Sequence, residues 1–251
     1  MTPLPRAHSH NDYWRKRPLQ DALECGFCSV EADIFLVGDQ LLVGHDPHEL
    51  RPERTLESLY LAPLRERARQ FRGRIYPDAP HFYLLIDVKS DAQPTYDALH
   101  KTLARYDDLL TRYEGARAYP RAVTAVLSGN RIPLERLERL GRERVRFVGY
   151  DGRLPDLDGD APATLMPWVS DSWARLFRWN GRGAFPDAER EQLQQILRRA
   201  HAKGYKLRFW GAPDIPPVWD ALWDAGADLI GTDLPYALCD FMWGKLKAAQ
   251  R

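Results

Sequence analysis

Hydrophobic and polar positions follow two different periods along the chain, and the two kinds of segment alternate almost from end to end. Short apolar or alternating runs predict eight strands, at 5–11, 27–37, 81–90, 122–129, 144–151, 163–169, 206–212 and 227–233. Between them, apolar residues recur at i, i+3, i+4 and i+7, which is typical of helices packed by one face. The longest of these helical segments is 96–115.

Eight strands alternating with helices over 251 residues predict one α/β domain, a (β/α)8 TIM barrel spanning 1–251. The pattern departs from the regular repeat twice. Between strands five and six, residues 153–162 are rich in Pro, Gly and Asp and leave no room for a helix. After strand two, residues 40–46 predict an extra strand, a hairpin arm over the barrel mouth. The alternative is a doubly wound open sheet, although no G-x-G-x-x-G follows the first strand.

Composition narrows the classes of function. The chain is 44% hydrophobic and 28% charged, so it can bury a sizeable core. A formal net charge of +1 gives no general attraction to nucleic acid or acidic membranes, and we expect neither as a partner. No apolar run approaches 18 residues, and the first residues lack the layout of a signal peptide. The sequence therefore predicts a cytoplasmic protein without a stable membrane anchor, and it does not indicate an oligomeric state.

Chemically active side chains gather at the ends of the predicted strands. In a barrel, the carboxyl ends of the strands form the active-site face. Strand one ends in an H-x-H-N run, and strands two and three carry acidic residues at i, i+2 spacing, which puts them on one face of each strand. The candidates at these ends are His8, His10, Asn11, Glu31, Asp33, His45, Asp87, Lys89 and Trp210.

Three carboxylates converge from neighbouring strands, those of Glu31, Asp33 and Asp87. Acidic residues inside apolar strands are costly unless they are paired or bound to a metal. Because like charges repel, a divalent cation would stabilise the cluster, and an all-oxygen ligand set suits the hard ions Mg²⁺ and Ca²⁺. The alternative is a salt-bridge cluster around Lys89.

Histidines beside a hard-metal site are better suited to moving protons than to binding the ion, since imidazole titrates near neutral pH. Two of them on opposite sides of a substrate could serve as general base and general acid. Lys89 beside the metal would hold a phosphate oxygen as a point charge. Together these residues favour cleavage of a phosphodiester, in which charge develops on the phosphoryl oxygens.

Several segments, in order, also resemble a known family. They are HSHNDY, PLQDALECGFCSVEADIFL, LLVGHDPHEL, TLESLYLAPL, LLIDVKS and LIGTDLP. The sequence resembles the glycerophosphodiester phosphodiesterases, within the phosphatidylinositol-phospholipase-C-like superfamily. The specific match is to a subgroup that includes the fungal altered inheritance of mitochondria proteins. This resemblance implies a metal-dependent TIM barrel that hydrolyses small phosphodiesters with two histidines.

The resemblance also implies roles for individual residues. Glu31 and Asp33 would bind the metal, and so would Asp87, which stands where the family usually has the longer Glu. Lys89 would bind the substrate, and His45 would be the second catalytic histidine.

The first catalytic histidine is either His8 or His10, because typical members have His-Arg-Gly where this chain has HSHND. We expect His10 and His45 to form the acid–base pair, with His8 orienting one of them. The family's phosphate-binding Arg has no counterpart here, and Asn11 could replace it. Trp210 would either line the substrate pocket or pack in the core.

Two other readings are open. An H-x-H on the first strand also begins amidohydrolase-like and phosphatase-like transition-metal sites, in which Asp233 would be the last ligand. Those sites need histidines on the middle strands, and none occurs between His100 and His201. The second is a catalytically silent barrel that only binds a phosphodiester. Asp233 is otherwise expected to cap the helix that begins near Leu234. The two alcohols esterified to the phosphate, which include lipid alcohols, are left open by the sequence. So is the attacking group, which is either water or a hydroxyl of the substrate.

Overall fold

The computed structural model describes residues 2–77 and 81–249. Nine of the strands form one sheet in the order β10-β9-β8-β7-β4-β2-β1-β11, with β3 paired to β2. Neighbours along this path pair in parallel. A parallel bridge between Arg208 and Leu229 joins the first strand of the order to the last. The result is a nearly closed barrel, as the sequence predicts. Its strands are β1 (Leu4–Ser9), β2 (Phe27–Val37), β4 (Phe82–Val88), β7 (Val123–Gly129), β8 (Val148–Gly152), β9 (Trp168–Ser172), β10 (Lys206–Trp210) and β11 (Ile230–Thr232).

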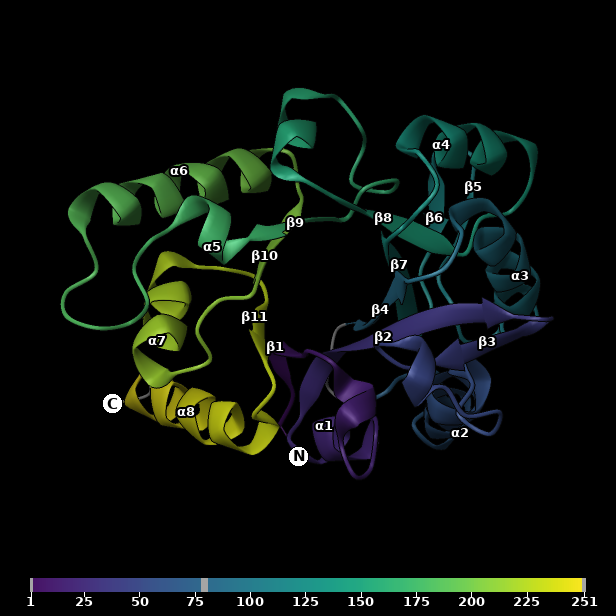
Figure 1. Ribbon diagram of the computed structural model, residues 1–251, viewed down its shortest axis with the longest axis horizontal. Coiled ribbons are helices and arrows are strands. Elements are labelled where there is room, and N and C mark those ends of the chain that lie inside the picture. The colour runs from purple at the N-terminus through teal and green to yellow at the C-terminus, as the bar shows by residue number, and fades with distance from the viewer. Residues whose placement is uncertain (1, 78–80, 250–251) are drawn as a thin grey trace.

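Helices surround this barrel, as Figure 1 shows. Each buries one apolar face against the strands, which is the arrangement that the helical periodicity predicts. The glycines just past three helix ends, Gly26, Gly204 and Gly226, have positive φ, as is usual for helix C-caps. The helices are α1 (Gln20–Glu24), α2 (Ala62–Gln70), α3 (Ala92–Ala104), α4 (Leu134–Glu143), α5 (Trp173–Leu176), α6 (Asp187–Ala202), α7 (Pro216–Ala225) and α8 (Pro235–Ala248), with 3-10 or π turns at Asp12–Trp14, Pro47–Glu49, Glu57–Leu61 and Leu154–Asp158.

Both predicted irregularities of the repeat occur. Between β8 and β9, the only helical segment is the 3-10 helix Leu154–Asp158, and all residues of this connection are described. After β2, strand β3 (Gln40–Val43) pairs antiparallel with it, from Ile34↔Val43 to Val37↔Gln40. The amide of Gly44 then donates to Asp33 O at 3.2 Å, so the hairpin arm delivers the next residue, His45, to the barrel mouth.

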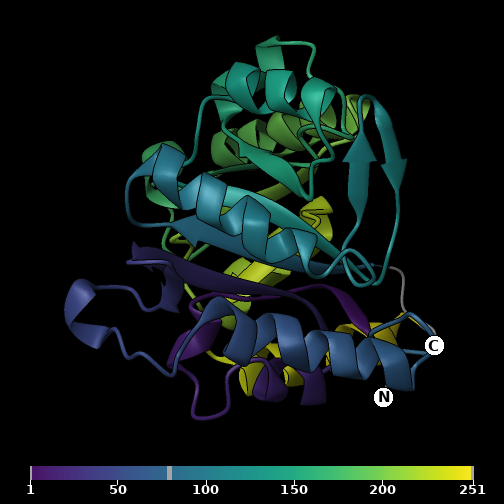
Figure 2. The same cartoon turned by 90° about the vertical axis from the view of Figure 1, so that its right-hand side faces the viewer.

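Two segments differ from the expectation. The sixth strand is Trp168–Ser172 rather than 163–169, because a turn closed by Leu165 N–H on Pro162 O (2.8 Å) occupies the first of those residues. The segment 96–115 is helical only to Ala104. Its end forms β5 (Arg112–Glu114), which pairs with β6 (Arg117–Tyr119) in a hairpin outside the barrel. Figure 2 shows this hairpin on the opposite side of the molecule from the projecting 47–49 turn.

The barrel interior is divided into an apolar layer and a polar layer. Leu85, Val126, Trp168 and Leu229 form a small buried cluster of their own inside the strands. Above it, toward the carboxyl ends of the strands, the interior side chains are charged or polar. Since a TIM barrel is filled by side chains rather than open, this layering confines the chemistry to the mouth. Within the described residues, no helix is both long enough and apolar enough to cross a membrane.

Candidate active site

Strand register brings the predicted carboxylates together at the carboxyl ends of β2 and β4. Asp33 is the direct cross-strand partner of Asp87, and Glu31 lies two residues earlier on the same face of β2. One carboxylate oxygen from each lies within 4.8 Å of the others. The glycine at the end of the next strand makes room for this cluster, because a Cβ on Gly129 would lie 2.3 Å from Asp87 Oδ1.

Two cations contact this acidic cluster. Arg208 Nη2 lies 2.5 Å from Glu31 Oε2, and Lys89 Nζ lies 3.0 Å from both Asp33 Oδ2 and Asp87 Oδ1. Burial and the nearby Glu31 charge raise the pKa of Asp33 and raise that of Asp87 to about 6. Burial acts in the same direction on Glu31, but its contacts with Arg208 and His8 hold its pKa well below the usual range. The salt-bridge cluster around Lys89 is therefore present.

The cluster nevertheless fits a hard divalent cation. Its donors are all carboxylate oxygens, the set that Mg²⁺ and Ca²⁺ prefer. Among the described residues, the buried Asp33 Oδ1 has no hydrogen-bond partner, although buried oxygens are rarely left unpaired. Three carboxylates against two cations also leave excess negative charge. Glu31, Asp33 and Asp87 are accordingly close enough together to hold a cation.

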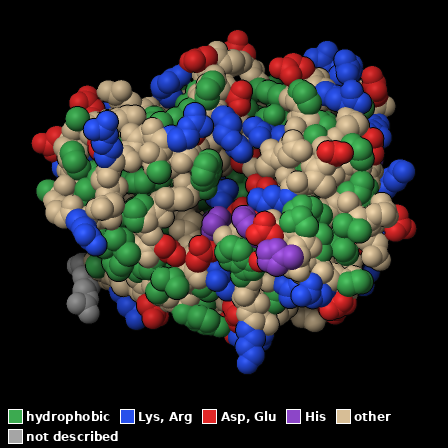
Figure 3. All heavy atoms as spheres, in the orientation of Figure 1, with side chains coloured by type: hydrophobic (Ala, Val, Ile, Leu, Met, Phe, Trp, Pro, Cys, Tyr) green, Lys and Arg blue, Asp and Glu red, His purple; other side chains and the backbone are tan. Residues whose placement is uncertain are grey.

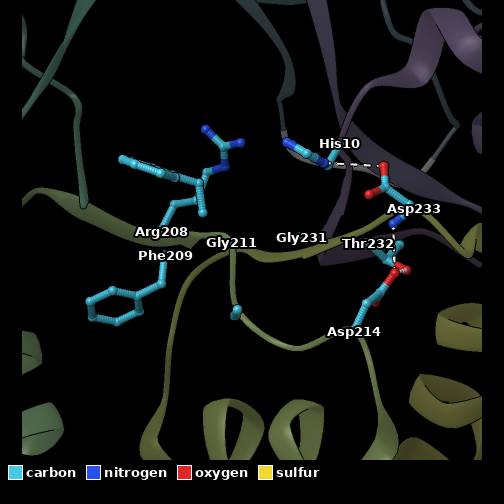
Figure 4. A pocket seen from close by; sticks show the side chains of 10 residues that line it. His10, Arg208, Phe209, Gly211, Asp214, Gly231, Thr232 and Asp233 are labelled. Atoms are coloured by element: carbon cyan, nitrogen blue, oxygen red, sulfur yellow. Dashed lines mark hydrogen bonds and ion pairs between the residues drawn. The ribbon is translucent and has the colours of Figure 1, made fainter. Parts of the chain in front are cut away.

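His10 follows β1 and is bound by the carboxylate of Asp233, the residue that follows the last strand. Its Nδ1 lies 3.1 Å from Asp233 Oδ1, and Arg15 donates to the same oxygen at 3.2 Å. Burial lowers the pKa of His10, but the bond to Asp233 and the charge of Glu31 outweigh it, so the pKa is raised overall. Figure 4 shows the other edge of the imidazole facing across the pocket toward Arg208.

Asp233 does not cap α8, contrary to the expectation. The residue preceding α8 is Leu234, and no side chain forms a cap bond there. The amide of Asp233 donates instead to Asp214 Oδ2 at 2.8 Å, and the Asp233 carboxylate binds His10 (Figure 4). Although burial opposes it, His10 and Arg15 lower the pKa of Asp233, which keeps this carboxylate ionised.

His45 has the same kind of partner on the other side of the cluster. Its Nδ1 lies 3.0 Å from Asp33 Oδ2 and 3.3 Å from the Tyr13 hydroxyl. Its ring packs against Trp14, with ring centres 5.3 Å apart. Within residues 2–77 and 81–249, Nε2 of His45 and of His10 has no hydrogen-bond partner. Each histidine thus has a carboxylate at Nδ1, and its Nε2 is left without a partner among these residues.

His8, in β1, and Asn11, just after it, are both buried. His8 is fully buried, with Nδ1 2.7 Å from Ser29 Oγ and Nε2 3.2 Å from Glu31 Oε2. Burial, with the Arg208 charge, lowers its pKa to about 4, which favours the neutral imidazole near neutral pH. Asn11 is 5% exposed and accepts the Tyr13 hydroxyl at 2.8 Å, so it positions neighbours and offers little surface to a substrate.

These contacts also disfavour an H-x-H transition-metal site. His8 binds Glu31 and Ser29, whereas Nδ1 of His10 faces Asp233, so the two imidazoles have separate partners. A shared transition-metal ion would need both rings and further histidines from the middle strands.

A pocket lies beside the cluster, between the ends of β10 and β11. Trp210 is 41% exposed at its rim, so it is not the packed core residue that was the alternative. In the orientation of Figure 1, histidines, acidic and basic side chains meet at a central hollow (Figure 3). The lining side chains that carry polar groups are His10, Arg208, Trp210, Asp214, Thr232 and Asp233.

Sequence reasoning missed Arg208 and the partner role of Asp233. Arg208 stands two residues before Trp210 in the strand KLRFW, and therefore on the same face. A charged residue inside an apolar strand is the same signal that identified Asp87. For Asp233 the signal was present but ambiguous, since an acidic residue before Leu-Pro fits a helix start equally well.

Comparison with known proteins identifies the family. The AIM6-like phosphodiesterase domain matches residues 1–151. Altered inheritance of mitochondria protein 6 of Eremothecium gossypii is 33% identical over 262 residues, covering 92% of this chain and 67% of that protein. Its homolog from Arthroderma benhamiae is 30% identical over 267 residues, covering 93% of this chain and 82% of that protein.

A solved structure has the same fold. The calcium-dependent phosphoinositol-specific phospholipase C from a Gram-negative bacterium, Pseudomonas sp, superposes with a TM-score of 0.58 at 12% identity, covering 92% of this chain and 90% of that one. At this identity the likeness concerns the barrel alone. The family assignment comes from the sequence matches, which span the strands that carry His10, Glu31, Asp33, His45 and Asp87. This chain belongs to the family of AIM6-like phosphodiesterase domains.

Proposed function

We propose that this protein is a metal-dependent hydrolase of small phosphodiesters, of the glycerophosphodiester type, with His10 and His45 as its acid–base pair. The observation that carries this proposal is the matched setting of the two histidines. Each has a carboxylate at Nδ1, Asp233 for His10 and Asp33 for His45, and each leaves Nε2 without a partner among the described residues. The two rings approach the acidic cluster from different elements, the end of β1 and the β3 arm.

The carboxylates define what each histidine can do. A carboxylate that accepts from Nδ1–H fixes the tautomer, so a neutral ring accepts a proton at Nε2 and a protonated ring donates one there. In the proposed reaction, one histidine takes the proton of the attacking water or substrate hydroxyl. The other gives a proton to the oxygen of the leaving alcohol.

Lys89 and a bound divalent cation would stabilise negative charge on the phosphoryl group. Lys89 follows β4, and its side chain is 26% exposed. Burial lowers the pKa of Lys89, but the charges of Asp87 and Asp33 outweigh burial, so the pKa is raised overall. A divalent cation held by Glu31, Asp33 and Asp87 would stabilise the charge that develops on the phosphoryl oxygens. The calcium dependence of the structurally similar phospholipase supports a hard ion such as Ca²⁺ or Mg²⁺.

The test is turnover of bis(p-nitrophenyl) phosphate and glycerophosphocholine by metal-stripped protein after addition of Mg²⁺, Ca²⁺, Mn²⁺ or Zn²⁺. We expect Mg²⁺ or Ca²⁺ to restore turnover, and His10→Ala and His45→Ala each to lower it by about 10²–10⁴-fold. His48→Ala is the matched control, because His48 is exposed three residues beyond His45 and contacts neither carboxylate. Turnover with Zn²⁺ alone, or turnover indifferent to both histidines, would contradict the proposal.

A further inference from the structure

Arg208 is a buried cation with unused hydrogen-bond donors. It lies in β10, it is 4% exposed, and its Nη2 donates to Glu31 Oε2 at 2.5 Å. A guanidinium has five N–H donors. Among the described residues, the buried Nε has no partner, and Nη1 donates no hydrogen bond. Because unpaired buried donors are costly, a side chain that serves only to neutralise Glu31 would not need to leave them without partners.

The guanidinium of Arg208 lies at the proposed reaction site. Arg208 and His10 line the same pocket, and Figure 4 shows the guanidinium and the free edge of the imidazole pointing toward one another from β10 and β1. Both side chains are held from behind, Arg208 by Glu31 and His10 by Asp233. A ligand between them would meet N–H donors on one side and a proton-transfer group on the other.

The charge of Arg208 also contributes to the net charge of the site. Lys89 and Arg208 leave the three ionised carboxylates with one net negative charge. A divalent cation would change this balance to one net positive charge. That value complements a phosphodiester monoanion, whereas the same site without Arg208 would be neutral.

We propose that Arg208 is a phosphate ligand of this active site, with its free N–H groups donating to a non-bridging oxygen while Glu31 holds the guanidinium from below. The assignment rests on the proposed phosphodiesterase function. A guanidinium suits this role better than an ammonium, because its planar fork can donate two parallel bonds to a phosphate. Arg208 would thus bind substrate directly and would not act only as the counterion of Glu31.

The experiment measures binding rather than turnover, by calorimetric titration of inorganic phosphate and, separately, of Mn²⁺. Arg208→Lys keeps a cation beside Glu31 but removes the fork, and Arg208→Gln removes the charge as well. We expect the phosphate Kd to rise by about tenfold or more in Arg208→Lys and further in Arg208→Gln. The Mn²⁺ Kd should stay close to the native value in Arg208→Lys, because the carboxylates remain neutralised.

Arg146→Lys is the matched control, since Arg146 is 3% exposed and binds the carbonyls of Val148 and Thr164, away from the mouth. It should change neither dissociation constant. Native phosphate affinity in Arg208→Lys, or parallel weakening of phosphate and Mn²⁺, would overturn the assignment. Should Arg208→Lys not fold, the phosphate affinity of Arg208→Gln or of a soluble Arg208→Met decides in the same way.

Turnover of bis(p-nitrophenyl) phosphate by the same preparations separates the two proposals. Native turnover combined with unchanged phosphate binding in Arg208→Lys overturns the role of Arg208 alone. The opposite result is also informative. If the native protein shows no turnover but its phosphate binding still depends on Arg208, Arg208 is a phosphate ligand and the proposed hydrolase activity is wrong.

Discussion

His10 Nδ1 lies 3.1 Å from Asp233 Oδ1, a contact between residues 223 positions apart that forms where the first strand pairs with the last. The register of β1 and β11 sets Ser9 opposite Thr232, and the amide of His10 donates to Thr232 O at 3.0 Å. Closure of the sheet therefore decides which group controls the protonation of His10. At the other histidine, the carboxylate is that of Asp33. Its Oδ2 contacts His45, Tyr13 and Lys89.

The first prediction concerns the acid–base behaviour of His10. In Asp233→Asn, the pKa of His10 should fall, because the carboxylate bond is the largest of the effects that raise it. Turnover should drop by about tenfold or more, since the tautomer is no longer fixed. The measurement is an NMR titration of the His10 ring together with the pH profile of kcat/KM. If His10 is the general acid, the basic limb moves to lower pH; if it is the general base, the acidic limb moves.

The control for this variant is Asp46→Asn, an exposed carboxylate near the mouth that contacts neither ring. It should leave the titration of His10 unchanged. An unchanged His10 titration in Asp233→Asn would show that the pair does not set the proton affinity of the ring.

The second prediction concerns stability in acid. His8 is fully buried with its pKa lowered to about 4, so the unfolded chain takes up a proton before the folded one does. His8 should therefore lower the free energy of unfolding by about 3 kcal/mol as the pH drops from about 6.5 to about 4, and this contribution should not grow below that range. Urea unfolding of the native chain and of His8→Gln should show the difference between them shrinking across this window. His48→Gln, at an exposed position, should parallel the native curve.

The third prediction concerns metal binding. Asp87 has its pKa raised to about 6, so it is protonated below that pH and ionised above it. Affinity for Ca²⁺ or Mn²⁺ should accordingly weaken as the pH falls through about 6, and Asp87→Asn should bind weakly at every pH. At neutral pH, a cation at about a hundredfold excess over its Kd should raise the free energy of unfolding by about 3 kcal/mol. Calorimetry from pH 5 to 8 tests this, and a pH-independent affinity would contradict it.

The fourth prediction concerns the glycine beside the carboxylates. Gly129 has φ of 70°, and a Cβ there would lie 2.3 Å from Asp87 Oδ1 and 2.5 Å from Val88 O. Gly129→Ala should destabilise the fold by about 1–3 kcal/mol and weaken metal binding, because Asp87 must move. Gly38→Ala is the control, since Gly38 has φ of 62° and no atom within 4 Å of the added Cβ. It should cost only about 1 kcal/mol and leave metal affinity unchanged.

Local sequence was enough to predict the barrel and most residues of its mouth. The i, i+2 spacing of Glu31 and Asp33 inside an apolar strand places both carboxylates on one face, whatever the rest of the chain does. The run after strand two likewise predicted β3. The β5–β6 hairpin was missed because Arg112–Glu114 continues the apolar spacing of α3, and only its pairing with β6 distinguishes it.

Tertiary structure alone decided how these side chains are paired. Two histidines two residues apart could not be told apart in sequence, yet one is fully buried on Glu31 and the other lies on Asp233 at the mouth. The contact of Arg208 with Glu31 joins residues 177 positions apart across the barrel interior. Strand periodicity fixes the face on which a side chain lies, but its partner depends on register and on barrel closure. These are set by the packing of the whole sheet.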